Sequence, residues 1–129
     1  MPIVTISMRK GRIKQEKRKI LDAVHDALVA AFKIPDTDRT QKIIEFNEEN
    51  FEVPKGKTLK YTLIEIAVFP GRSARAKKDL YRLIVEKLGA LGMPANDVFI
   101  LLNEQPLDNW GIRGGQMASD VQLGYAVKV

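Results

Sequence analysis

With 129 residues and a net charge of +5 at neutral pH, the chain is long enough for one domain with a substantial core and favours anionic partners. It contains no cysteine, which excludes disulfides, thiolate catalysis and thiolate metal sites, and its single histidine argues against a His-based zinc site or a Ser-His-Asp triad. No apolar stretch approaches the ~18 to 20 residues of a membrane span. Basic residues interrupt the first apolar run, unlike in a signal peptide, so we expect a cytoplasmic protein. We expect no cofactor.

The first half of the chain is predicted to form a strand, a helix and a second strand. The first strand covers Ile3–Met8 and follows Pro2 directly. Apolar residues spaced by three and four predict a helix over about Lys14–Phe32, and Pro35 marks its end. After a turn rich in Asp and Thr, Ile43–Phe46 has the pattern of a short strand.

The second half is predicted to repeat this order. Leu59–Phe69 is expected to be the longest strand, central and covered on both sides, because both of its faces are apolar. A helix is predicted over about Ser73–Leu91, and a fourth strand over Val98–Leu102. A turn-rich segment, Asn109–Gly115, then leads to a weak terminal strand near Gln122–Val129.

The two halves are related by a repeat with a period of about 60 residues. Lys10-Gly11-Arg12 precedes the first helix as Pro70-Gly71-Arg72 precedes the second, and Ile34-Pro35 and Met93-Pro94 follow the two helices. Arg12 is therefore the repeat partner of Arg72, and it can reach a site in a neighbouring subunit.

This repeat predicts a single α+β domain over residues 1–129, built from two βαβ units. The units cover about residues 2–48 and 59–104, and residues 105–129 form a C-terminal segment. Right-handed crossovers place both helices on one face of a four-stranded sheet. The other face carries apolar side chains and has no element left to cover it, so we expect a homo-oligomer.

Pro2 stands at the head of the first strand, where two interpretations are open. If the initiator methionine is removed, Pro2 becomes a secondary amine fixed by the sheet. Burial and nearby cations would lower the pKa of that amine, which allows it to act as a general base near neutral pH. Alternatively, Pro2 only begins an edge strand, where its missing N–H costs nothing.

The start of the second helix is a candidate anion site. Arg72 and Arg75 suit a carboxylate, which can accept two hydrogen bonds from one guanidinium, and the N–H groups of the helix start add further donors. The alternative is a simple turn with solvated arginines. Asp38 and Arg39 lie in a turn, where an Asp commonly bonds its own backbone, so these residues alone indicate a structural Asp38. Arg39 either pairs with Asp38 or binds substrate.

Two further residues have both structural and functional interpretations. Trp110 lies in the glycine-rich segment and is either a hydrophobic lid that keeps a site dry or ordinary packing. His25 lies between Asp22 and Asp26 on the flank of the first predicted helix, and we expect it to be a surface histidine.

The arrangement resembles the tautomerase superfamily of 4-oxalocrotonate tautomerase-like proteins, and within it the malonate semialdehyde decarboxylase branch. The matching segments span essentially the whole chain, from Pro2 through Ile34–Gln41 and Asp79–Leu88 to Asp108–Gly111. The resemblance implies two βαβ units, assembly as a homotrimer, and catalysis by an N-terminal proline.

Residue by residue, the resemblance implies roles for several positions. Pro2 matches the catalytic proline, Asp38 an aspartate that assists in decarboxylase and hydratase members, and Arg72 one of two arginines that hold the substrate carboxylate. The second arginine falls where this chain has Pro70, and Arg75 is a candidate substitute. Trp110 matches an aromatic wall of the site, whereas Ile112 replaces a second aromatic residue.

Several functions are consistent with these residues. The leading hypothesis is keto-enol tautomerisation of a small 2-oxo acid by Pro2, with arginines holding the carboxylate. Decarboxylation or hydration chemistry of the malonate semialdehyde type, with Pro2, Asp38 and Arg72, is the alternative. A non-catalytic trimeric scaffold is a third. Nucleic-acid binding is disfavoured because the third predicted strand offers Leu63, Ile64, Ile66 and Val68 and no cluster of stacking aromatics like that of RNA-binding domains with this element order. No membrane partner is expected.

Overall fold

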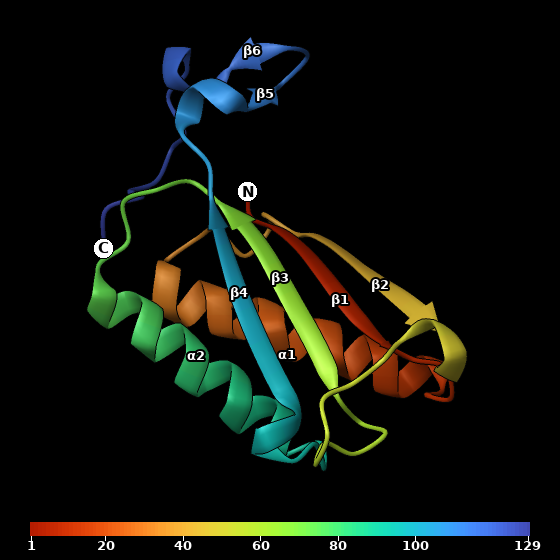
Figure 1. Ribbon diagram of the computed structural model, residues 1–129. Helices are drawn as coiled ribbons and strands as arrows, with labels where there is room; N and C mark the ends of the chain where they lie inside the picture. The colour runs from red at the N-terminus through yellow and green to blue at the C-terminus, as the bar shows by residue number, and fades with distance from the viewer.

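The computed structural model describes residues 1–129, which form a four-stranded sheet with two long helices on one face (Figure 1). The main elements are β1 (Ile3–Arg9), α1 (Lys14–Phe32), β2 (Thr40–Phe46), β3 (Thr62–Val68), α2 (Ala74–Gly89) and β4 (Val98–Glu104). The short elements are 3₁₀ helices at Glu48–Asn50, Ala95–Asp97, Leu107–Asn109 and Ala118–Asp120, and the strands β5 (Gly111–Ile112) and β6 (Gln116–Met117).

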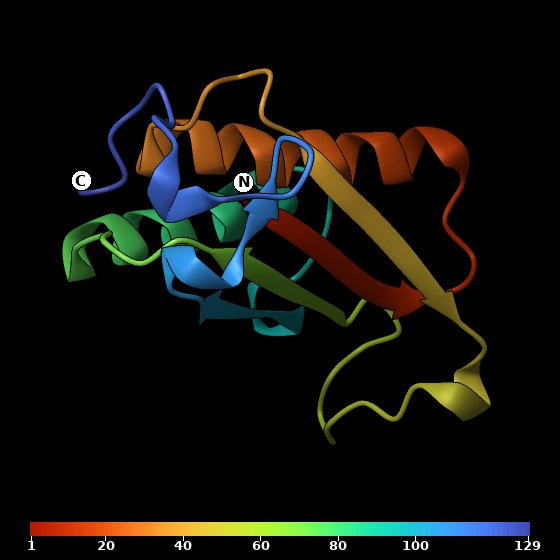
Figure 2. The same ribbon diagram turned by 90° about the horizontal axis from the view of Figure 1, so that it is seen from above.

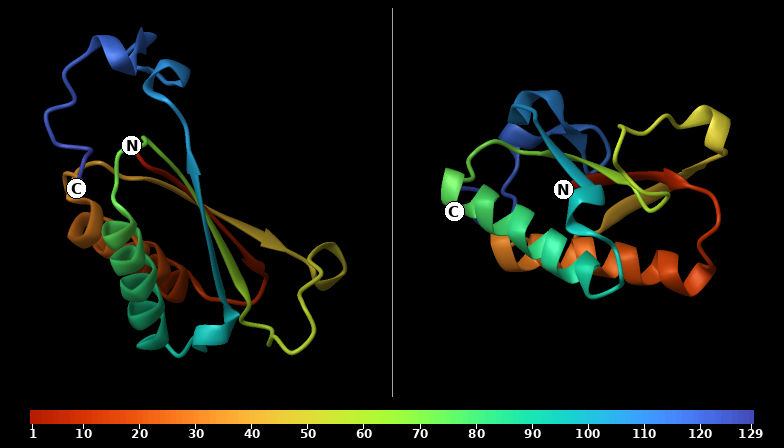
Figure 3. Two further views of the ribbon diagram at one scale, coloured as in Figure 1. Left: turned by 60° about the vertical axis from the view of Figure 1, so that its left-hand side comes forward. Right: turned by 60° about the horizontal axis from the view of Figure 1, so that its bottom comes forward.

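The strand order β2-β1-β3-β4 confirms the predicted pair of βαβ units. β1 pairs in parallel with β2, β3 in parallel with β4, and the two central strands β1 and β3 are antiparallel. Both crossover helices cover the same side of the sheet, as predicted, and pack against each other (Figure 3). Neither helix combines the length and apolarity needed to cross a membrane.

The two turns from strand to helix have the same local structure. Gly11 has φ +132° and Gly71 has φ +127°, a region of backbone conformation that only glycine adopts without strain. In α2 the Ser73 hydroxyl then accepts a hydrogen bond from the amide of Ala76 at 3.1 Å, which caps the helix and stabilises it by about 1 kcal/mol. Lys33 ends α1 in the left-handed conformation, with φ 57°.

The core lies between the sheet and the helices. Residues of β3 alternate between buried and half-buried, and Ile64, Ile66 and Val68 face the helices. The helices bury Val24, Leu28, Leu80, Ile84 and Leu88 against them, at the spacing of three and four that predicted helices here.

The opposite face of the sheet is largely uncovered. Ile44, Ser7, Leu63 and Phe99 lie in one row across the four strands on this side. Phe99 is 54% exposed, Leu101 44% and Ile44 41%, so an apolar surface faces solvent in the isolated chain.

The predicted length of the third strand was wrong. We expected Leu59–Phe69 to be the longest strand, but β3 covers only Thr62–Val68 and all four strands have seven residues. Thr58 draws the chain into a turn before β3, because its amide donates to the Asp97 carboxylate at 3.0 Å.

The predicted terminal strand near Gln122–Val129 does not form. Residues after β4 instead fold into short 3₁₀ turns and the β5–β6 pair. The last residues form bends and end beside the start of α2, where the amide of Ser73 donates to the Val129 carbonyl at 2.9 Å. Gly124, with φ +84°, interrupts the extended backbone that a strand here would need.

His25 is not a surface residue, contrary to the prediction. It is 1% exposed, and its Nε2 lies 3.2 Å from the Asp36 carboxylate. The loop after α1 covers this part of the helix, which the sequence pattern of α1 alone does not reveal.

Candidate active site

The topology places Pro2 at the meeting point of several loops. Pro2 is buried immediately before β1, which is a central strand. Because Ile3 pairs with Thr40 at the start of β2 and with Ala67 near the end of β3, residues before β2 and after β3 surround this end of β1. The C-terminal segment, residues 105–129, lies over the same end (Figure 2).

Asp38 comes from the loop before β2 and contacts the amino group of the chain. Its carboxylate hydrogen-bonds to the Met1 ammonium, and both groups are partly buried. The Asp38 amide donates to the Pro35 carbonyl at 3.0 Å, so a turn holds the backbone while the side chain points to Met1. An amine and a carboxylate therefore meet at the start of β1.

Arg72 comes from the turn after β3 and is 7% exposed. Its Nη1 donates to the Phe69 carbonyl at 3.1 Å, and its guanidinium carbon lies 4.9 Å from the centre of the Phe32 ring. Its Nε has no hydrogen-bond partner, and no carboxylate forms an ion pair with it. Burial lowers the pKa of Arg72, partly offset by the nearby Tyr125 hydroxyl. A buried, unpaired guanidinium favours an anionic ligand.

Trp110 forms an apolar wall at this end of the sheet. Its ring packs edge-on against Phe69, with centroids 4.9 Å apart, and its indole N–H donates to the Gln105 carbonyl at 3.1 Å. Met1, Ile3 and Ala118 belong to the same apolar cluster. Trp110 therefore anchors the C-terminal segment over the start of β1.

A cavity of about 350 Å³ opens beside these groups. Its lining residues are Met1, Pro35, Thr37, Asp38, Phe69, Ile112, Arg113, Leu123 and Tyr125. The cavity thus combines apolar walls with the Asp38 carboxylate, the Arg113 guanidinium and the Tyr125 hydroxyl. This mixture suits a small anion with an apolar body.

Tyr125 and Arg113 were missed by the reasoning from sequence. The Tyr125 hydroxyl donates to the Met1 carbonyl at 3.3 Å, and burial raises the pKa of this phenol, so it is protonated at neutral pH. Arg113 has φ 49° and donates to the Gln122 carbonyl at 2.9 Å. The only features of the sequence that point to these two residues are the basic Arg113 inside the glycine-rich segment and the single tyrosine, Tyr125, near the C-terminus.

The structure does not bring Arg75 or Arg39 to this cavity. Arg75 lies in the first turn of α2, next to the buried Ala76. Because successive helical residues are rotated by about 100°, the Arg75 side chain points away from the core. It is 85% exposed, and its Nε lies 3.5 Å from the Asp79 carboxylate. Arg39 is adjacent to Asp38 but points the other way, as neighbours do in extended chain, and pairs with Asp22 of α1 at 2.8 Å.

Comparison with known proteins identifies the family. A family profile described as "Tautomerase enzyme" matches residues 38–113, more than half of the chain, and a second with the same description matches residues 2–60. The chain belongs to the tautomerase family. It is a tautomerase-type enzyme with relatives of the malonate semialdehyde decarboxylase kind, as the resemblance in sequence implied.

Three known proteins resemble most of the chain. The probable tautomerase YusQ of Bacillus subtilis is 27% identical over 124 residues, which cover 90% of this chain and 96% of YusQ. FG41 malonate semialdehyde decarboxylase inhibited by 3-bromopropiolate is 28% identical, with a TM-score of 0.82 over 89% of this chain and 92% of that chain. A symmetric trimer of fused 4-OT has a TM-score of 0.80 at 23% identity, over 91% of this chain and 96% of that chain, which shows a shared fold.

Proposed function

We propose that Met1 is removed and that the exposed Pro2 amine is the proton-transferring group of a keto-enol tautomerase acting on a small 2-oxo acid. The observation that carries this proposal is the position of the chain's amino group, which lies in contact with Asp38 on a cavity that also contains Arg113 and Tyr125. Removal of Met1 moves the amino group to Pro2, at the buried start of a central strand, and vacates the part of the site that Met1 fills.

The proposed reaction transfers one proton between two atoms of the substrate. The Pro2 amine accepts the proton of an enol hydroxyl and returns it to the neighbouring carbon, which leaves a ketone. The apolar side chains of Phe69, Ile112 and Leu123 line the cavity; they exclude water and favour the neutral amine, which is the basic form.

The substrate carboxylate is proposed to bind on the arginine side of the cavity. Arg113 lines the cavity, and Arg72 donates a hydrogen bond to the carbonyl of Phe69, one of the lining residues. The protonated Tyr125 hydroxyl is a hydrogen-bond donor between them, suited to an enolate oxygen or the carboxylate. Arg75 and Arg39 have no part in this site, because both pair with carboxylates elsewhere.

Decarboxylation of a 3-oxo acid such as malonate semialdehyde is the second candidate. Asp38 contacts the Met1 ammonium, one residue from the Pro2 nitrogen, and this favours decarboxylation, since a carboxylate near the Pro2 amine can hold it protonated. A protonated amine then stabilises the enolate formed when the bond to the carboxylate carbon breaks and carbon dioxide leaves. The likeness to FG41 malonate semialdehyde decarboxylase points the same way.

Asp38→Asn separates the two reactions. If the protein is a tautomerase that uses neutral Pro2, ketonisation of phenylpyruvate enol should change less than about tenfold in kcat/KM, because the base does not need the carboxylate. If decarboxylation is the main reaction, turnover of malonate semialdehyde should fall by about 10² or more, the scale of a lost acid–base group. Both assays are run on the same preparation, with Asp36→Asn in the same loop as the control.

The uncovered sheet face is proposed to be buried in a homotrimer. Ile44, Leu63 and Phe99 supply the apolar surface, and the fused 4-OT neighbour of this fold forms a trimer. The charge of Phe99→Glu should split the assembly, because an unpaired carboxylate is costly in an apolar interface.

Light scattering coupled to size exclusion measures this assembly. We expect the mass of three chains for the native protein and for Lys78→Glu, a change on exposed α2 surface, and a lower mass for Phe99→Glu. A native mass of one chain, or an unchanged trimer in Phe99→Glu, would contradict the proposed interface.

A further inference from the structure

The repeat produces a second hollow at the opposite end of the sheet from Pro2. The two units are related in space by a shift of 60 residues. Val4 pairs with Ile66 and Ile6 pairs with Ile64, so replacing each residue by the one 60 positions away turns one pair into the other. The operation exchanges Gly11 with Gly71, which share the same backbone conformation, and therefore Arg12 with Arg72. It also exchanges Pro2 with Thr62, at the start of β3.

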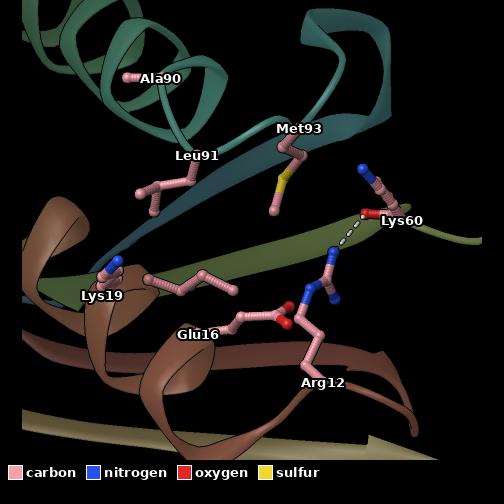
Figure 4. Close-up of a pocket in the computed structure, with 8 residues that line it drawn as sticks. Arg12, Glu16, Lys19, Lys60, Ala90, Leu91 and Met93 are labelled. Carbon is pink, nitrogen blue, oxygen red and sulfur yellow. Dashed lines mark hydrogen bonds between the residues drawn. The ribbon is translucent and has the colours of Figure 1, made fainter.

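The hollow at the start of β3 has a volume of about 310 Å³, at the lower end of the range of small-molecule sites. Arg12 projects into it from the turn after β1, Glu16 and Lys19 come from α1, and Leu91 and Met93 come from the turn after α2 (Figure 4). The remaining lining residues are Ile20, Lys60 and Ala90. An apolar floor is thus combined with a cluster of charges.

Arg12 is held in place but its charge is not neutralised. Its Nη2 donates to the Lys60 carbonyl at 3.2 Å, and its Nη1 lies 3.4 Å from the Met8 sulfur, so two contacts fix the guanidinium at the rim of the hollow. No carboxylate lies within ion-pair distance of Arg12 in the chain. Burial lowers its pKa, so an anionic ligand would offset the lost hydration.

The charges around the hollow leave a net positive field. Arg12, Lys19 and Lys60 face a single carboxylate, that of Glu16, and none of the four forms an ion pair. The other carboxylates near Arg12 are engaged elsewhere. Glu45 pairs with Lys17 at 3.0 Å, and Asp97 accepts hydrogen bonds from Thr58.

We infer that this hollow binds a small carboxylate with an apolar chain, the carboxylate on Arg12 and the chain against Leu91 and Met93. The site binds without catalysing proton transfer, since Thr62, inside the chain and fully buried, stands where the other unit has Pro2 and offers no amine. It is also open, because the C-terminal segment that covers the Pro2 end has no counterpart here. The inference stands apart from the proposed chemistry at Pro2.

Hexanoate is a suitable probe, because it has the carboxylate and the apolar chain but no carbonyl to react. In a titration followed by amide NMR shifts, we expect saturable changes at Leu91 and Met93. Hexanol, which lacks the charge, should bind at least about tenfold more weakly, as should hexanoate to Arg12→Met, because a hydrogen bond to a charged group is lost. Lys10→Met, an exposed cation two residues away, should bind hexanoate normally.

A second variant guards against misfolding of Arg12→Met. Leu91 is 42% exposed, so Leu91→Trp can fill the hollow from the surface without disturbing the core, and it should also weaken hexanoate binding. Shifts confined to Arg113 and Tyr125 at the Pro2 end, or binding unchanged in both variants, would overturn the inference. The NMR shifts at Leu91 and Met93 measure binding and require no turnover. A loss of hexanoate binding at this hollow is therefore distinguishable from a loss of catalysis at Pro2.

Discussion

Replacing Pro2 with alanine should lower kcat/KM for ketonisation of phenylpyruvate enol by about 10² to 10⁴, the range of a lost general base. Alanine is small enough for Met1 still to be removed, so an amine remains, but it is primary, more flexible and less basic than the secondary amine of proline. The base works in its unprotonated form, and activity therefore falls as the pH drops through its pKa. Because the pKa of the alanine amine is lower, the acidic limb of the residual activity should move to lower pH.

The shifted pH limb is what distinguishes a catalytic Pro2 from a structural one. Ile3→Val, at the adjacent position of β1, serves as the matched control and should keep both the rate and the pH profile. A Pro2→Ala enzyme that is folded and retains its native kcat/KM would show that the amine takes no part in proton transfer. So would a reduced rate with an unchanged pH limb.

Removing the guanidinium of Arg72 should have the next largest effect. Arg72→Met keeps an unbranched side chain but removes the guanidinium that lies over the Phe32 ring, and we expect kcat/KM to fall by about 10² to 10³, the scale of a lost oxyanion donor. KM should rise as well, because the same group is proposed to help hold the substrate carboxylate. Steady-state kinetics on phenylpyruvate enol, with circular dichroism to verify folding, measures both.

Arg75→Met is the natural control for Arg72, since it removes the same charge three residues along the chain. The Arg75 side chain is exposed and paired with Asp79, so activity should stay within about twofold of the native value. Arg72→Lys adds a second comparison: it retains the charge without the planar fork, and partial activity is expected. A larger loss of activity in Arg75→Met than in Arg72→Met would show that Arg75, and not Arg72, holds the substrate carboxylate.

Local pattern was sufficient to predict most of the fold. The spacing of Ile20, Val24, Ala27 and Leu28 predicted α1 with the bounds that it has in the structure, and the internal repeat predicted the topology of the sheet. The sequence-based predictions were wrong where contacts between residues far apart in the sequence determine the local structure. The turn before β3 depends on Asp97, and the burial of His25 depends on the loop that contains Asp36.

The candidate site was only partly accessible from sequence. Pro2, Asp38 and Arg72 occupy strand ends and turns that the βαβ order brings together, so their grouping at one end of β1 follows from topology. Tyr125 and Arg113 belong to a segment positioned by the packing of Trp110 on Phe69, and no periodicity predicts such a position. Arg75 does not line the cavity, because its rotation about the axis of α2 turns its side chain toward Asp79.

Proton transfer by Pro2 requires that Pro2 has a free amine, and the intact mass of the purified, untagged protein shows whether it does. We predict the mass of residues 2–129, with Met1 absent and no modification of the new amino group. A mass that includes Met1, or an added acetyl group, would contradict every mechanism in which Pro2 transfers the proton.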